Sequence, residues 1–187
     1  MARESVLTPL GLAALSLLVE EPMHPYEMYQ LLIARHEDRL VKVRPGTLYH
    51  AVGRLEEQGL VAATGTDREG NRPERTTYTI LAAGREAFTK RLQDMLAIPV
   101  NEYPSFPLAI SEAYNLPSGV VVELLDRRLQ ALQEQLDFLV SAEERLREKG
   151  VDRKYWVDVQ YQQSMLRTEV AWIRGFQDEL RSGELPW

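Results

Sequence analysis

The sequence predicts a mainly α-helical fold with one small β-hairpin, arranged as a compact N-terminal part followed by two long antiparallel helices. Three observations support this prediction. Helical patterns that open with proline occupy most of the first third of the chain, a stretch rich in β-forming residues follows them, and two long amphipathic helices complete the sequence. Because a domain averages roughly 150 residues, a chain of 187 residues accommodates one small domain and an extension.

The first three helices are predicted by their starts and by their apolar residues. Residues 9–21 form a helix that opens with a threonine and a proline and is apolar nearly all round, so we expect it to be buried. A second helix follows over residues 25–35, and a third over residues 45–59, which ends at a glycine. The third helix has a stripe for burial, spaced by three and four, made of Leu48, Ala51, Val52 and Leu55.

A β-hairpin and a fourth helix follow. Residues 60–64 and 75–80 are rich in β-forming residues, and a polar loop with glycine, asparagine and proline separates them. A fourth helix is predicted over residues 82–97. The order of three helices, a hairpin and a helix is that of a winged helix-turn-helix, so we expect residues 1–97 to form such a domain, the DNA-binding domain.

The remainder of the chain is predicted to be a connector and a helical hairpin. Residues 98–117 contain four prolines, with a short helix between the last two, and residues 118–150 and 152–182 form helices of about 45 Å each. A winged domain of about 80 residues cannot cover the apolar stripes of both helices. We therefore expect residues 118–187 to form a dimerisation domain that pairs with a second copy of the chain. The dimerisation residues expected in the stripes are Leu129, Leu132, Leu136, Leu139, Trp156, Val159, Leu166, Val170, Ile173 and Leu180.

The composition excludes several classes of protein. There is no cysteine, which rules out disulfide scaffolds and thiolate zinc sites. The longest apolar stretch, residues 10–19, is about half the length of a membrane span, and no cleavage signal opens the chain, so we expect a soluble cytoplasmic protein. The three histidines are too scattered for a metal site, and phosphate-binding glycine patterns are absent. We therefore expect no enzyme, no metal and no cofactor.

The charge is distributed unevenly along the chain. Residues 1–90 carry 11 basic and 12 acidic side chains, a net charge of −1, whereas residues 91–187 carry 11 basic and 16 acidic side chains, a net charge of −5. The window of residues 39–55 contains Arg39, Lys42, Arg44 and Arg54 and no acid. A local basic patch of this kind favours nucleic-acid binding even in a chain whose net charge is −6.

The segment Gly46–Val61 contains a Gly-Thr-Leu-Tyr start to the third helix, an Arg-Leu-Glu stretch, and Gly-Leu-Val entering the wing. With these motifs the segment resembles the PadR family of transcriptional regulators. Residues 24–28 and 78–84 are similar to the family's second helix and wing exit, although Leu81 stands where threonine is usual. Residues 98–187 look like the helical C-terminal domain of the longer members. The resemblance implies a DNA-binding regulator.

In a helix-turn-helix, the third helix lies in the major groove and presents its N-terminal residues to base edges. We expect Thr47, His50 and Arg54 to face the bases, with Tyr49 at the groove edge and the backbone at Gly46 close to a phosphate. The basic residues before the helix would contact the sugar-phosphate backbone, the wing would reach the adjacent groove, and the resemblance adds a phosphate contact from the second helix. The expected DNA-binding residues are Tyr26, Arg39, Lys42, Arg44, Gly46, Thr47, Tyr49, His50, Arg54, Arg68, Asn71, Arg72 and Arg75.

Aromatic residues are concentrated on the last helix. Trp156, Trp172 and Phe176 are candidates for stacking against a small aromatic effector. Trp156 also falls on the apolar stripe, so packing in the core is the competing interpretation.

The sequence therefore favours a homodimeric repressor that binds an inverted-repeat operator on double-stranded DNA, with a small aromatic ligand as a candidate effector. The alternative is a winged-helix module that binds other proteins without specific DNA binding, because a fold alone does not fix a function.

Overall fold

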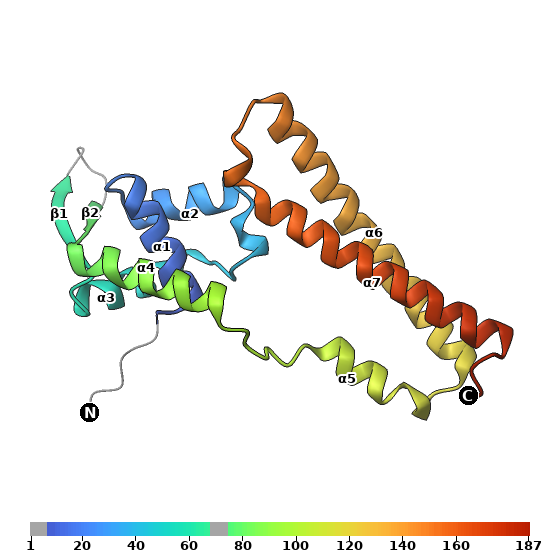
Figure 1. Ribbon diagram of the computed structural model, residues 1–187. Coiled ribbons are helices and arrows are strands. Elements are labelled where there is room, and N and C mark those ends of the chain that lie inside the picture. Colours follow the sequence, from blue (N-terminus) through green and yellow to red (C-terminus); the bar gives the residue numbers. More distant parts are fainter. Residues whose placement is uncertain (1–6, 68–74) are drawn as a thin grey trace. The chain divides into compact units, whose positions relative to one another are not determined.

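The computed structural model describes residues 7–67 and 75–187, and the chain divides into two compact units, one up to Asn101 and one from Glu102 to Trp187 (Figure 1). The first unit contains helices α1 to α4 and a two-stranded antiparallel sheet; the second contains α5 to α7. The elements are α1 Pro9–Glu20, α2 Pro25–Ala34, α3 Pro45–Glu57, β1 Val61–Asp67, β2 Arg75–Ile80, α4 Ala82–Ala97, α5 Ser105–Ser111, α6 Ser118–Glu148 and α7 Val157–Ser182. This is the mainly helical fold with a winged helix-turn-helix that the sequence predicts.

The first three helices begin where the prolines predict. Thr8 caps α1, because its Oγ1 accepts a hydrogen bond from the Gly11 backbone N–H at 3.1 Å. Helices α2 and α3 likewise start at Pro25 and Pro45, whose missing N–H is no loss in the first turn.

These helices surround one apolar core. Helix α1 is buried almost all round, and α3 buries the four residues of its predicted stripe. The largest fully buried side chains of this unit are Leu15, Leu17, Leu18, Met28, Leu32, Leu48, Val52 and Val61. The core fixes the orientation of α3, because its stripe cannot turn outward without exposing these side chains.

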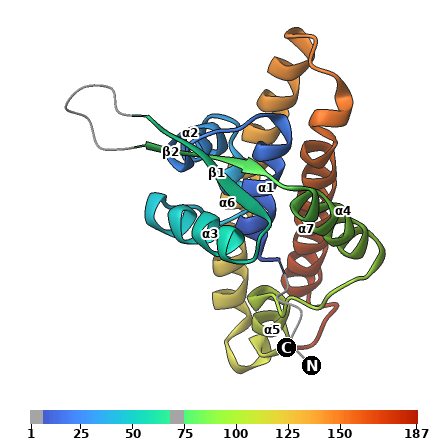
Figure 2. The same cartoon turned by 90° about the vertical axis from the view of Figure 1, so that its left-hand side faces the viewer.

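The hairpin is longer than predicted and is joined to the helices at its base (Figure 2). Strand β1 continues to Asp67 because the register shifts between Ala63 and Gly65, and this irregularity lets pairing resume beyond the glycine. Met23 exchanges two backbone hydrogen bonds of 3.1 Å with Tyr78, which ties the sheet to the turn between α1 and α2. Three expected wing contacts, Arg68, Asn71 and Arg72, lie outside the described residues. Arg75, the fourth expected wing contact, is the first residue of β2.

Helix α4 starts close to Leu60, the residue that precedes β1. A Cβ atom at Gly84 would lie 2.1 Å from the Leu60 carbonyl oxygen, so only glycine fits there. The same carbonyl accepts the Leu81 backbone N–H at 3.0 Å. Leu81 gives α4 no side-chain cap, as its place in the sequence predicts.

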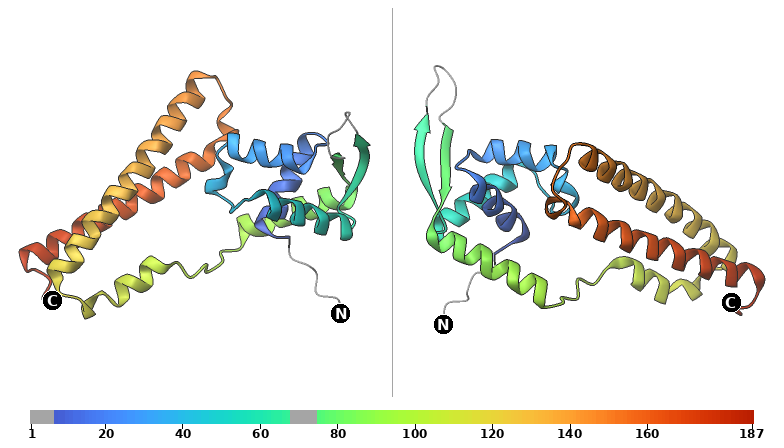
Figure 3. Two further views of the ribbon diagram at one scale, coloured as in Figure 1. Left: turned by 180° about the vertical axis from the view of Figure 1, so that it is seen from behind. Right: turned by 45° about the horizontal axis from the view of Figure 1, so that its top comes forward.

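The second unit is a hairpin of the two long helices with the short α5 (Figure 3). Helix α6 begins at the predicted residue. Helix α7 begins at Val157 rather than at Asp152, after a 3-10 turn at Arg153–Tyr155. Trp156 causes the difference, because its backbone is non-helical (φ −144°, ψ 19°) while its ring is buried at 3% exposure. No helix within residues 7–67 and 75–187 is long and apolar enough to cross a membrane.

The apolar stripes of α6 and α7 face each other within one chain. Most of the predicted dimerisation residues are buried there without any second copy, namely Leu132, Leu139, Trp156, Val159, Val170 and Ile173. Leu129, Leu136, Leu166 and Leu180 are half-buried. Two glutamines, Gln163 and Gln177, lie in the same interface at 3% and 1% exposure. The expectation that this stripe faces a second copy therefore needs revision, because α6 and α7 already use it to pack against each other.

Candidate nucleic-acid interface

Helix α3 presents a polar side to solvent. Thr47, Tyr49, His50 and Arg54 are all exposed, opposite the buried stripe. The structure therefore brings the expected base-facing residues together on one side of a helix that the core holds in place.

The hydroxyl of Thr47 has a structural partner that the sequence did not predict. Thr47 Oγ1 accepts the Arg44 backbone N–H at 3.1 Å and donates to the Arg44 carbonyl at 2.9 Å. Both bonds close the start of α3, where backbone groups have no partners within the helix. The hydroxyl proton is thus engaged in the fold, which leaves the methyl group and one acceptor lone pair of Oγ1 for another molecule.

Tyr49 is positioned by a residue of the preceding helix. The His24 ring lies edge-on to the Tyr49 ring, with centroids 5.7 Å apart and an interplanar angle of 74°. His24 is also the N-cap of α2: its Nδ1 accepts the Tyr26 backbone N–H at 3.0 Å, and its own backbone N–H donates to Glu27 Oε2 at 2.9 Å. Because Nδ1 accepts, the proton of a neutral ring is on Nε2.

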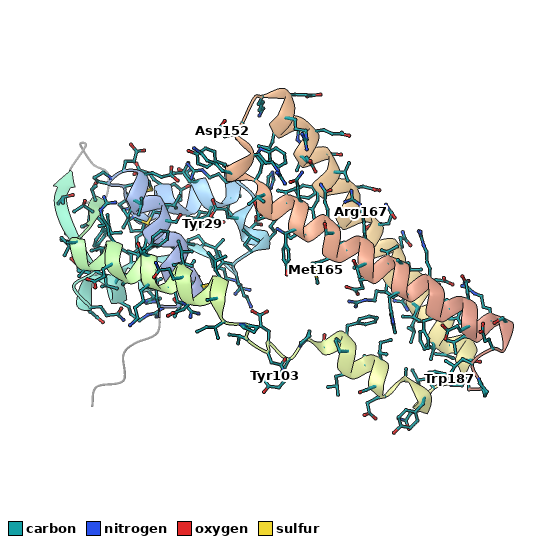
Figure 4. All side chains as sticks on the ribbon, viewed as in Figure 1. Tyr29, Tyr103, Asp152, Met165, Arg167 and Trp187 are labelled. Carbon is teal, nitrogen blue, oxygen red and sulfur yellow. The ribbon has the colours of Figure 1, made fainter. Side chains whose placement is uncertain are left out.

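His24 was missed as a site residue by sequence analysis. Its signals are the position before Pro25, which Thr8 also holds before Pro9, and Glu27 three residues later, but histidine is not among the common caps. Tyr26, the neighbouring candidate, is exposed in the first turn of α2, and its ring centroid is 6.5 Å from that of the half-buried Tyr29 (Figure 4).

The three basic residues before α3 differ in exposure. Lys42 and Arg44 are exposed, and Arg44 is extended (φ −140°, ψ 152°), as the residue before a proline prefers. Arg39 ends the 3-10 turn Glu37–Arg39 and is half-buried, with its Nη1 atom fully buried. Lys42 and Arg44 therefore suit a sugar-phosphate contact better than Arg39 does.

The C-terminal end of α3 is acidic and contacts the hairpin. Tyr78 Oη donates to Glu56 Oε2 across 3.4 Å, a long hydrogen bond. Partial burial, followed by the negative charge of Glu56, raises the pKa of Tyr78, so the hydroxyl stays protonated. Glu57 follows and is exposed. This end of the helix repels a phosphate backbone.

The aromatic candidates for a ligand site divide into two groups. Trp156 is buried, its indole N–H donates to the Val151 carbonyl at 2.9 Å, and Arg147 lies over its ring at 4.9 Å. Trp172 is half-exposed and stacks on Phe176, with centroids 5.3 Å apart. The competing interpretation of Trp156 as a core residue therefore fits its position. Within the part of the chain that the structure describes, no cluster of three or more histidine or acidic side chains could hold a metal ion.

Comparisons with known proteins agree with this fold. The family model described as "Transcriptional regulator PadR-like family" matches residues 14–90, which contain α2, α3 and the hairpin. This confirms the resemblance seen at Gly46–Val61. The family consists of transcriptional regulators rather than enzymes. A search of curated proteins found no match.

Solved structures of similar fold cover almost the whole chain. Bacillus subtilis PadR in complex with operator DNA superposes with a TM-score of 0.77 at 17% identity, over 91% of this chain and 97% of that one. The same protein in complex with p-coumaric acid superposes with a TM-score of 0.76 at 16% identity, over 92% of this chain and 98% of that one. A PadR-like transcriptional regulator from Bacillus cereus superposes with a TM-score of 0.66 at 16% identity, over 93% of this chain and 99% of that one. At these identities the matches establish the fold.

Proposed function

Because residues 14–90 form a domain of the transcriptional regulator PadR-like family, we propose that this protein is a homodimeric repressor that binds an inverted-repeat DNA operator. Helix α3 of each protomer would enter the major groove, and the twofold symmetry of the dimer would match the symmetry of the operator. The B. subtilis structure with operator DNA, which shares this fold, supports the proposal.

The observation that carries the proposal is the exposed side of α3. His50 and Arg54 reach solvent from a helix whose opposite side is locked in the core, and Lys42 and Arg44 lie just before it. No acidic residue falls between Arg39 and Leu55. A surface that bound only proteins would have no need of an acid-free window on this element.

Selection from a random-sequence duplex library tests the proposal. We expect the enriched sequences to contain an inverted repeat with half-sites about 34 Å apart, and a mobility shift to show a discrete complex that resists scrambled competitor DNA. Affinity should fall steeply between about 50 and 200 mM salt, because phosphate contacts release counterions. The Arg54→Ala variant should bind the selected duplex more weakly by about 1–3 kcal/mol if Arg54 contacts a base.

The outcomes separate this function from the alternative. If no sequence is enriched, or if competitor removes all binding, the protein is not a sequence-specific regulator. A winged-helix module that binds other proteins is then the better description.

The dimer requires a surface that one protomer leaves open, and the outer face of α7 provides one. This face lies opposite the stripe that packs on α6, and Figure 4 shows Met165 pointing away from α6. Tyr161 and Met165 are 67% and 55% exposed. The residues of the α7 outer face are Val157, Tyr161, Ser164, Met165, Thr168, Ala171, Trp172 and Gly175, all exposed and all uncharged.

A second copy of the chain suits this face. A twofold interface brings the same surface from both protomers together, so a face without charge meets no like-charge repulsion when it pairs with itself. The face extends over about 27 Å of helix. Its small residues, among them Ala171 and Gly175, allow two helices to approach closely. We therefore assign dimerisation to the α7 outer face rather than to the buried stripe.

Relief of binding by a small planar aromatic compound is the last part of the proposal. The p-coumaric acid complex of B. subtilis PadR supports it. In this chain Trp172 stacks on Phe176, meets Phe106 edge-on with ring centroids 6.5 Å apart, and is 49% exposed. Adding p-coumaric acid to the operator complex should release the DNA and change the tryptophan fluorescence. Retention of the full complex at saturating p-coumaric acid would exclude this effector.

A further inference from the structure

Glycine occupies half of the central positions on the exposed side of α3. Successive residues of an α-helix are about 100° apart, which places Gly46, His50, Gly53 and Glu57 on the line directly opposite the buried stripe. Thr47 and Arg54 lie at one edge of that line, and Tyr49 lies at the other edge. Two of the four central positions are therefore glycine.

The fold gives no reason for glycine at position 53. A Cβ atom built on Gly53 meets no atom within 4 Å, and the backbone is ordinary helix without a positive φ. Gly84 differs, because a Cβ there would collide with the Leu60 carbonyl. A glycine inside a helix costs stability relative to alanine. Gly53 thus weakens α3 with no compensating contact inside the protomer.

The charges limit the part of α3 that can approach DNA. Glu56 and Glu57 close the helix, whereas the residues from Gly46 to Arg54 contain no acid. A DNA duplex can therefore contact the first turns of α3, whereas the acidic last turn would repel its phosphates. Gly53 is the last central position before the acidic end.

We propose that Gly53 is the point of closest approach between α3 and operator DNA, where the helix backbone itself lies against the floor of the major groove. Gly46 serves the same purpose at the start of the helix, and His50 between them is the central side chain that reaches the bases. The inference rests on the proposed function, and it adds a residue that sets the depth of the helix in the groove.

Substitutions at Gly53 test this placement in the full-length protein. Operator affinity is measured by mobility shift on the selected duplex and on a scrambled duplex, and thermal melting is measured in parallel. Gly53→Ala should raise Tm by a few degrees, since alanine favours the helix. The same variant should weaken operator binding about fivefold or more, as an added methyl group does at a close-packed contact. Gly53→Leu should abolish the preference for operator over scrambled DNA.

Gly119→Ala is the matched control. Gly119 is also a helical glycine in open space, but it lies in the first turn of α6. This variant should bind the operator like the wild type. If Gly53→Ala is more stable and binds the operator with unchanged affinity, the close approach is wrong while the proposed function stands. If the wild-type protein shows no preference for any duplex, the proposed function fails and this inference fails with it.

Discussion

The side-chain amide of Gln163, buried in the interface of the helical hairpin, donates to Glu143 Oε2 at 2.8 Å and to the Leu139 carbonyl at 3.2 Å. Gln177 repeats the arrangement, donating to Asp126 Oδ1 at 2.8 Å and to the Val122 carbonyl at 3.0 Å. In both cases one amide of α7 bridges a carboxylate of α6 and the carbonyl four residues before it. These hydrogen bonds fix the register of the two helices. Leucine side chains alone could pack in several registers, whereas each buried amide finds its two acceptors in one register.

Gln163→Leu should lower the free energy of unfolding by about 1–3 kcal/mol, because the donor is lost while its buried acceptors remain. Chemical denaturation at fixed protein concentration measures the effect. Gln130→Leu is the control, since Gln130 is exposed and its side-chain amide donates to Glu134 in the next turn. Equal stability of the two variants would show that the buried bridge contributes nothing.

The second prediction concerns acid. Hydrogen bonds from Arg147, Gln160 and Gln163 hold the pKa of Glu143 below its ordinary value, with Arg147 the largest cause. The unfolded chain therefore binds this proton more readily than the folded one. The stabilisation is fully present above the ordinary glutamate pKa of about 4.3 and is lost as the pH falls through the lower folded value.

Denaturation curves between about pH 3 and 7 check this direction. Glu143→Gln should be less stable than the wild type at neutral pH and should lose less stability on acidification. Glu144→Gln changes an exposed neighbour and should keep the wild-type profile. A Glu143→Gln profile parallel to that of the wild type would show that this carboxylate is not part of the acid response.

The elements that follow from local chemistry were predictable, and those that depend on distant contacts were not. The prolines predicted the first residues of α1, α2 and α3, because the preference of proline for the first turn of a helix depends only on the local sequence. Trp156 interrupts the start of α7 for a tertiary reason, the burial of its ring, which no local pattern contains. The capping role of His24 is equally invisible, since it depends on the Nδ1 tautomer and on one rotamer.

The candidate sites divide in the same way. Burial of Leu48 and Leu55 fixes the exposed side of α3, so His50 and Arg54 could be predicted from spacing. The seam residues of α6 and α7 were predicted as apolar, but periodicity does not say which helix covers a stripe. The partner proved to be in the same chain. The α7 outer face mixes small and large residues without a leucine repeat, so a heptad search passes over it.

The third prediction tests that face. In size-exclusion chromatography with light scattering, the wild-type protein should have the molar mass of a dimer of the 21.4 kDa chain. The double variant Tyr161→Lys/Met165→Lys should be a monomer, because four lysines would then meet across the twofold axis. Its helix content by circular dichroism should be unchanged, since both side chains are exposed.

The matched control is Gln130→Lys/Gln135→Lys, which adds the same charge to exposed positions of α6. This variant should remain a dimer. A lysine-substituted α7 face that still dimerises would place the interface elsewhere, and a monomeric wild-type protein would exclude the symmetric operator complex.

The fourth prediction separates the two halves of the Thr47 side chain. Thr47→Ser keeps the hydroxyl that closes the start of α3 and removes the methyl group. It should retain stability and lose discrimination at one operator position where the methyl group contacts a thymine. Thr47→Val keeps the methyl group and should cost about 0.5–2 kcal/mol of stability, as the loss of a helix cap does. Melting temperatures and binding to single-base operator variants measure the two effects; the reverse pattern would mean that the hydroxyl reads DNA.

The last prediction concerns His24, which joins the start of α2 to Tyr49 on α3. Asparagine can accept the Tyr26 N–H in place of Nδ1, so His24→Asn should retain the cap, whereas His24→Ala should lose about 0.5–2 kcal/mol of stability. Both variants remove the ring that lies edge-on to Tyr49. If that ring holds Tyr49 at the groove edge, both should weaken operator binding to the same extent, although only one is destabilised. Tyr49→Phe is the comparison, because it keeps the ring pair and removes the hydroxyl. Wild-type affinity in His24→Asn would show that Tyr49 needs no support from α2.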